Sequence, residues 1–240
     1  MIAIRWGMLL LAALSILAAF GVMSSFGQPS LLRVEAAAVV AVLAPLFWPG
    51  LGATPVRTAL RVFGWSMSAA AMAAITIAVL SRPAQPWLPI AVACVMLLSI
   101  LILTHAAAAG LECRWRQRSQ DADGARELAG RAVAAALLLF GTLPFWLGPV
   151  AEVISVRHPR AIDFIVGLSP VTHLAVASGN DLLRNPWVYK HSNLASLRVD
   201  YPEPVALAWG YGSACVALGL VALAITSRAA RRPAPEPALK

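Results

Sequence analysis

Long apolar blocks, separated by short polar segments, constrain the fold of this chain more than any other feature. In residues 62–80 and 87–109, apolar side chains occupy the whole circumference of a helix. Such a helix must be surrounded by lipid or by other helices. Only 12% of the residues are charged, whereas a soluble domain has about a quarter. The sequence therefore predicts an all-α membrane protein and excludes an ordinary soluble domain.

Six of these blocks are long enough to cross the bilayer as helices. They are residues 7–26, 34–53, 62–80, 87–109, 132–156 and 205–227. Prolines interrupt the second and fifth blocks, which predicts kinks there or a short second helix. The first block is longer than the apolar core of a signal peptide, and we interpret it as a retained span. Residues 1–227 are thus expected to form one transmembrane domain, and the Pro-rich residues 228–240 a disordered tail.

The distribution of basic residues predicts the orientation of these helices. With the N-terminus in the cytoplasm, twelve of the 19 Lys and Arg residues fall on the cytoplasmic side. Five of the other seven lie in one long connection, residues 157–204. Because cytoplasmic loops carry an excess of Lys and Arg, we expect a multi-pass protein of the inner (cytoplasmic) membrane with both termini in the cytoplasm. Residues 157–204 then form an extracytoplasmic connection. Topology explains the net charge of +8, and no nucleic-acid partner is expected.

A short helix is predicted between the fifth and sixth blocks, in residues 167–184. Ser169 is a good N-cap, and Pro170 suits the first helical position. Apolar and polar side chains then fall on different faces, with Thr172 and His173 on the polar face. We therefore predict an amphipathic or re-entrant helical segment at the outer interface between spans five and six. A plain extracellular loop with an interfacial anchor is the alternative.

The order of these elements resembles the permease subunit of ABC exporters of the type-two class. The resemblance rests on six spans, a kinked fifth span, and the sequence Leu168-Ser169-Pro170 followed by VTHLAVASGNDLL. It implies a subunit that hydrolyses nothing itself and works with a separate cytoplasmic ATPase and a second permease half, as a homodimer or heterodimer. The G-x-x-x-x-G-K-S/T phosphate loop is absent from the sequence, as expected of such a subunit. Few charged residues lie in the spans, which favours a lipid-like or amphipathic cargo.

Two sets of candidate site residues follow from the resemblance and from the cost of ionisable side chains near the bilayer interior. The candidate gate or pathway residues are Glu152, Pro170, His173 and Asp181. The candidate ATPase contacts, in loops 54–61 and 112–131, are Arg57, Arg61, Arg114 and Arg116. Two alternatives stay open: Glu152 could pair with a neighbouring arginine, and loop 112–131 could serve only as a positive anchor on the cytoplasmic side.

Other patterns in the sequence carry weaker indications. His105, near the inner end of the fourth span, is interpreted as a satisfied or snorkelling histidine. The remaining histidines have no metal-ligand spacing, so no metal, cofactor or catalytic residue is predicted. Ala206, Gly210 and Ala214 recur every four residues, which predicts close helix packing within the chain or in a dimer. The alternative functions are a non-catalytic subunit or assembly factor of a larger membrane complex, and an integral membrane enzyme.

Overall fold

The computed structural model describes residues 37–80, 87–119, 121–155, 163, 166–179 and 203–230. Within these ranges the chain forms helices and no strand, which confirms the all-α class. Three helical segments are long and apolar enough to cross a membrane: Pro55–Ile75, Trp87–Arg116 and Pro204–Ala229. Three such helices are typical of a multi-pass membrane protein. The first predicted span, residues 7–26, lies outside the described residues.

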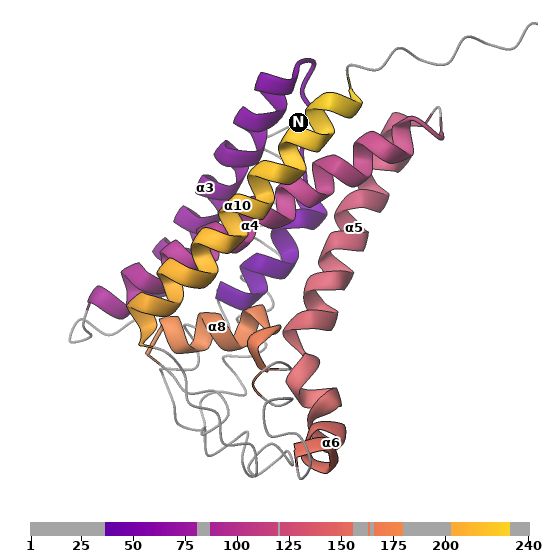
Figure 1. The fold of residues 1–240 in the computed structure, drawn as a ribbon. Coiled ribbons are helices and arrows are strands. Elements are labelled where there is room, and N and C mark those ends of the chain that lie inside the picture. Colours follow the sequence, from indigo (N-terminus) through magenta and orange to yellow (C-terminus); the bar gives the residue numbers. More distant parts are fainter. Residues whose placement is uncertain are drawn as a thin grey trace, which may run out of the picture.

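Four long helices form a bundle in which the chain alternates direction (Figure 1). They are α3 (Pro55–Leu80), α4 (Trp87–Arg116), α5 (Ala122–Gly141) and α10 (Pro204–Ala229). Helix α4 is central, because α3, α5 and α10 all pack against it. Its apolar side chains Met96, Leu97 and Leu101 are fully buried in the core, as expected of a helix that is apolar on every side.

Helices α4 and α10 make the most extensive contact in the bundle. Gly212 of α10 faces Ser99, and Gly219 faces Ile102 so closely that an added Cβ would lie 3.1 Å from its Cγ2. The predicted stripe of Ala206, Gly210 and Ala214 lies elsewhere, because all three residues are exposed. Packing of this stripe within the chain is therefore wrong for the described residues. The glycines that do pack against α4, Gly212 and Gly219, lie on a different face of α10 from this stripe.

The second predicted span ends earlier than residue 53, in line with the expectation of a kinked or short helix. Within the described residues the helix covers Ala37–Phe47, and its last turn is the 3₁₀ helix η1 (Ala44–Phe47). Pro45 and Pro49 explain the shortening, since proline removes a backbone donor and restricts the residue before it. Residues 48–54 then connect η1 to α3, and we call the first five of them loop 48–52. The predicted end of the second span at residue 53 is wrong, because residues 48–53 are not helical.

The fifth predicted span is divided into α5 and α6 (Leu143–Ser155), with a break at Thr142. Pro144 explains the break, because its ring would clash with the carbonyl of residue 140 in a continuous helix. The start also differs from the prediction. Asp121 caps α5 by accepting hydrogen bonds from the N–H groups of Asp123 and Gly124. The predicted loop 112–131 is therefore mostly helix, since helix-forming residues and a strong N-cap outweigh its charge.

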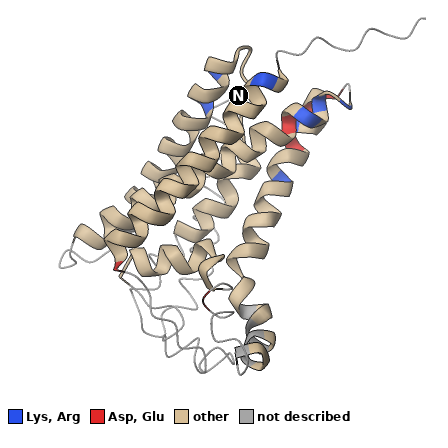
Figure 2. Ribbon diagram, in the orientation of Figure 1, with Lys and Arg blue, Asp and Glu red and all other residues tan. Residues whose placement is uncertain are grey.

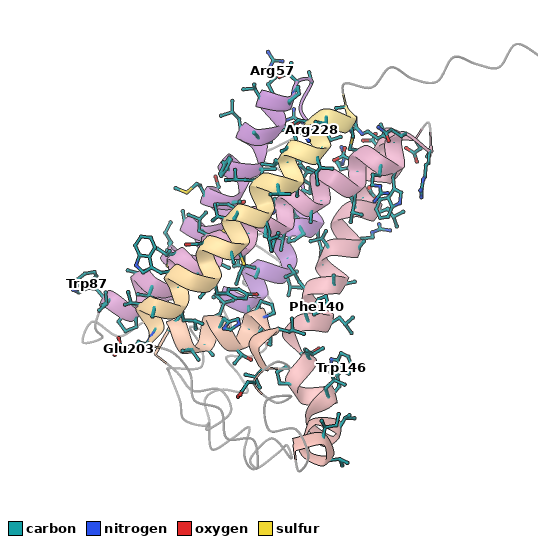
Figure 3. All side chains as sticks on the ribbon, in the orientation of Figure 1. Arg57, Trp87, Phe140, Trp146, Glu203 and Arg228 are labelled. Atoms are coloured by element: carbon teal, nitrogen blue, oxygen red, sulfur yellow. The ribbon has the colours of Figure 1, made fainter. Side chains whose placement is uncertain are left out.

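Basic residues gather at one end of the bundle (Figure 2). We call it the basic end, and it is made by the start of α3, the end of α4, the first turns of α5 and the end of α10. Its Arg residues are Arg57, Arg61, Arg114, Arg116, Arg118, Arg126, Arg131 and Arg228. The opposite end carries Trp87 and Glu203 (Figure 3). The described helices thus carry their basic residues at one end of the bundle only, as the helices of membrane proteins commonly do.

Candidate functional site: a buried short helix and a buried carboxylate

The predicted helix start at Ser169 is confirmed. Helix α8 (Pro170–Ala177) has Ser169 as its N-cap, and the Ser169 hydroxyl oxygen accepts a hydrogen bond from the Thr172 N–H at 3.3 Å. The same hydroxyl donates to the Gly141 carbonyl at 2.9 Å, which ties the cap to the end of α5. The helix ends at Ala177, and Gly179 follows with a φ of +77°, the left-handed conformation that commonly terminates helices.

Helix α8 is buried on almost every side at the end of the bundle opposite the basic end (Figure 1). It packs against α4, α5 and α10. Thr172 and His173 are buried together with the apolar Leu174 and Ala175. The polar face predicted for this segment is therefore not exposed in α8. The neighbouring helices cover that face, and sequence periodicity cannot detect a cover supplied by distant segments.

His173 is the main polar side chain of α8. Its Nε2 lies 2.8 Å from the Gly167 carbonyl oxygen, and because a carbonyl only accepts, Nε2 carries the proton. The ring also contacts the Tyr211 ring of α10, with 4.1 Å between centroids. Burial lowers the pKa of His173 below the ordinary value of 6.5, against the opposing effect of the Gly167 hydrogen bond. His173 is therefore a neutral side chain that joins α8 to α10.

Acidification is expected to destabilise the chain through His173. Below about pH 6.5 the unfolded chain binds a proton at this position that the folded chain does not, so stability falls as the pH drops. His173→Phe keeps an aromatic ring against Tyr211 and cannot titrate. The melting temperature in detergent, measured from about pH 7.5 to 5, should fall less for this variant than for the wild type. Equal pH slopes would contradict this assignment.

The structure places the candidate gate residues only in part. Pro170 and His173 lie together in α8. Glu152 lies in α6, but its side chain is not among those that the structure describes, and its pairing with an arginine stays untested. Asp181 lies outside the described residues. Of the candidate gate, the structure therefore describes the side chains of Pro170 and His173 in α8.

The four candidate ATPase contacts all lie at the basic end but differ in their surroundings. Arg57 and Arg114 are exposed, and neither side chain has a hydrogen bond or ion pair within the described part of the chain. Arg61 instead donates from Nη1 to the carbonyl oxygens of Gly50 and Leu51. Arg116 forms an ion pair with Glu112. Two arginines are therefore available to a partner, whereas two organise the chain itself.

Glu112 is the residue that sequence reasoning missed. Its side chain is fully buried near the end of α4. Its Oε2 accepts hydrogen bonds from the Trp48 indole N–H at 2.7 Å and from the Leu51 backbone N–H at 3.1 Å. Its Oε1 pairs with Arg116, one turn further along the helix. The signal in the sequence was a single acidic residue in a 30-residue apolar helix, four residues before an arginine.

Trp48 joins this carboxylate to the interior of the bundle. Its ring stacks on His105, with 5.8 Å between centroids and 20° between planes. His105 is fully buried, and its Nδ1 lies 2.8 Å from the Ser66 hydroxyl of α3. The interpretation of His105 as a satisfied histidine holds for Nδ1 only, because Nε2 is buried with no hydrogen-bond partner among the described residues. Snorkelling is wrong, since the side chain is fully buried. A series of contacts thus runs from Ser66 of α3 by a hydrogen bond to His105, by ring stacking to Trp48, and by a hydrogen bond to Glu112.

Among the described residues, no group of three or more His, Cys, Asp or Glu side chains could hold a metal ion. The chain matches no family model, no curated protein and no solved structure. A functional interpretation therefore depends on α8, on the basic end and on the Glu112 site.

Proposed function

We propose that this chain is the membrane-spanning permease subunit of an ABC-type exporter that works with a separate ATPase. The observation that carries the proposal is α8, a short Ser-Pro-capped helix buried between α4, α5 and α10 at the end opposite the basic end. A short helix that returns into the bundle before the last long helix is the feature implied by the resemblance to type-two permeases. The proposal includes six spans, a re-entrant α8 and an inner-membrane location.

The basic end supports the orientation in this proposal. Positive residues mark the cytoplasmic side of membrane proteins, so both termini and the ATPase are assigned to the side of the basic end. Arg57 and Arg114, whose side chains have no partner within the described part of the chain, extend from α3 and α4 at this end (Figure 3 labels Arg57). We assign the ATPase contact to them, because an acidic surface of a partner could pair with each of them without breaking a bond in the chain.

The proposed gate is α8 with the break between α5 and α6. The Ser169 cap connects α8 to the carbonyl of Gly141, next to the break at Thr142. A tilt of α5 would therefore be transmitted to α8. In the proposed cycle, the nucleotide state of the ATPase shifts the population between two arrangements of these helices. A second permease half completes the pathway.

Purification of the full-length tagged chain from its own membranes in a mild detergent tests this proposal. We expect a soluble ATPase with a phosphate-binding loop to elute with it in a stoichiometric amount. Arg57→Glu combined with Arg114→Glu should reduce the recovered ATPase by about tenfold or more, because each substitution replaces an attractive charge with a repulsive one.

Arg228→Glu is the matched control, since Arg228 is also exposed at the basic end (Figure 3) but lies on α10. It should leave the recovery of the ATPase within about twofold of wild type. If Arg228→Glu reduced the recovery of the ATPase equally, the loss would reflect the net charge of the basic end, and the assignment of the contact to Arg57 and Arg114 would be wrong. Recovery of components of another membrane complex without any ATPase would favour the alternative function of a non-catalytic subunit or assembly factor.

A further inference from the structure

The loop of residues 48–52 is held to α4 through one carboxylate. Glu112 accepts hydrogen bonds from two residues of the loop, from the Trp48 side chain and from the Leu51 backbone. Gly50, between them, has a φ of +89°, and an added Cβ would lie 3.0 Å from Cδ of Arg126 and 3.3 Å from Oε1 of Glu112. Such a conformation favours glycine, and it lets the loop close tightly over the carboxylate.

The same loop is bonded to the start of α3. The Gly52 N–H donates to the Thr58 hydroxyl at 3.0 Å, and Arg61 donates to the carbonyl of Gly50 at 3.1 Å. An added Cβ at Gly52 would lie 2.6 Å from backbone atoms of Arg57 and Thr58, so the loop lies directly against the first turn of α3. The position of that turn therefore depends on the loop, and the loop depends on Glu112.

Holding a loop with a buried carboxylate requires the free energy of desolvating a charged group. Apolar side chains of similar size could fill the same volume without the desolvation of a charge, and they often give equal or greater stability. Directional hydrogen bonds do what apolar packing does not, because they fix one conformation of the bonded backbone. Glu112 is the only acidic residue of the described chain with a fully buried side chain. Its chemistry thus points to a requirement for one defined position of the loop.

We propose that Glu112 is a positioning residue for the ATPase contact, which it sets by fixing loop 48–52 and, through it, the first two turns of α3 that carry Arg57. This inference rests on the proposed function and adds to it a residue that touches no partner. Trp48 extends the effect inward, since the indole that donates to Glu112 also stacks on His105 between α3 and α4. A displacement of the α3 turn by the partner would thereby reach the interior of the bundle.

Glu112→Gln tests the first step on the chain alone. The amide keeps the shape and one acceptor oxygen but loses the charge and the pairing with Arg116. Hydrogen exchange at the Leu51 amide, measured by mass spectrometry, should accelerate about tenfold, because bonds to a charged acceptor are about twice as strong as neutral ones. Amides of α10 should be unchanged. Glu127→Gln, the same change in an exposed ion pair with Arg131, should leave the Leu51 amide protected.

A double-mutant cycle with the ATPase tests the second step. Glu112→Gln should weaken ATPase binding to the purified chain about tenfold, and Glu127→Gln should not. If Glu112 acts through the α3 turn, then Glu112→Gln with Arg57→Glu binds no more weakly than Arg57→Glu alone. The inference is overturned if the losses of affinity of the two single variants multiply in the double variant, or if Glu112→Gln binds the ATPase as tightly as the wild type. Either result leaves the proposed function in place. A wild-type chain that binds no ATPase overturns both, whatever the exchange of Leu51.

Discussion

Gly130→Ala is expected to destabilise the bundle, although alanine is the better helix former by about 1 kcal/mol. Gly130 of α5 lies against η1, and an added Cβ would be 2.4 Å from the carbonyl oxygen of Pro45 and 3.3 Å from its carbon. Both atoms belong to the backbone, so no rotamer change can relieve the clash. Overpacking of this kind costs typically about 1–3 kcal/mol. We expect a melting temperature in detergent lower by about 5 °C.

The clash would also reach the Glu112 site. The same Pro45 carbonyl accepts a hydrogen bond from the Trp48 backbone N–H at 3.1 Å, so moving η1 moves the indole that donates to Glu112. Gly64→Ala is the control, because Gly64 lies within α3 and an added Cβ there has no neighbour within 4 Å. It should leave the melting temperature unchanged or raise it. An equal fall for both variants would contradict the close packing of α5 on η1.

The apolar blocks predicted the existence of the third, fourth and sixth helices, but not every end. The third predicted span, residues 62–80, starts too late, because α3 begins at Pro55, so the predicted loop 54–61 is wrong for residues 55–61. The fourth and sixth predicted spans correspond to α4 and α10, with ends displaced by no more than two residues except at the end of α4, which continues to Arg116. The sequence did not predict this continuation, because residues 112–116 are rich in charge. Glu112 and Arg116 look like loop residues in the sequence, but they pair one turn apart on the helix. Composition alone cannot distinguish a charged loop from a charged helix end.

The prolines correctly predicted which spans are irregular, but not how each helix is interrupted. The sequence predicted that the second and fifth spans are irregular, but not that the second helix ends at Phe47 or that the fifth divides at Thr142. Whether a proline bends or ends a helix depends on whether other groups bond the freed backbone. After η1, the backbone N–H of Leu51 is bonded by Glu112, which lies 61 positions further along the chain. Sequence periodicity contains no information about such a distant partner.

The candidate site was only partly predictable for the same reason. The Ser-Pro start of α8 is a local signal, and the structure has the helix there. The burial of His173 depends on Tyr211, which is remote in sequence. The four arginines lie at one end and all are exposed, but the bonds of two of them depend on the fold. Arg61 bonds to loop 48–52, and Arg116 pairs with Glu112 because α4 continues that far. Local chemistry identifies starts and ends, whereas long-range packing decides what is buried.

Gly219→Leu is expected to disrupt the contact between α4 and α10. An added Cβ at Gly219 already lies 3.1 Å from Cγ2 of Ile102, and 3.4 Å from its carbonyl oxygen and from Cα of Leu103. A leucine places three further carbon atoms against these backbone atoms, so the helices must separate. The expected cost is about 3 kcal/mol, at the upper end of overpacking effects. It should appear as a melting temperature lower by about 10 °C, or as loss of the monodisperse species in detergent.

Gly210→Leu is the matched control for this helix and also tests the small-residue stripe. Gly210 is exposed, and an added Cβ there has no neighbour within 4 Å. The melting temperature of the monomeric fraction should stay within about 2 °C of wild type, because a surface change in a helix costs about 0.5 kcal/mol or less. If the second permease half packs on Ala206, Gly210 and Ala214, the same variant lowers the fraction of dimer measured by light scattering. A Gly210→Leu monomer as unstable as Gly219→Leu would mean that α10 presents a different face to α4.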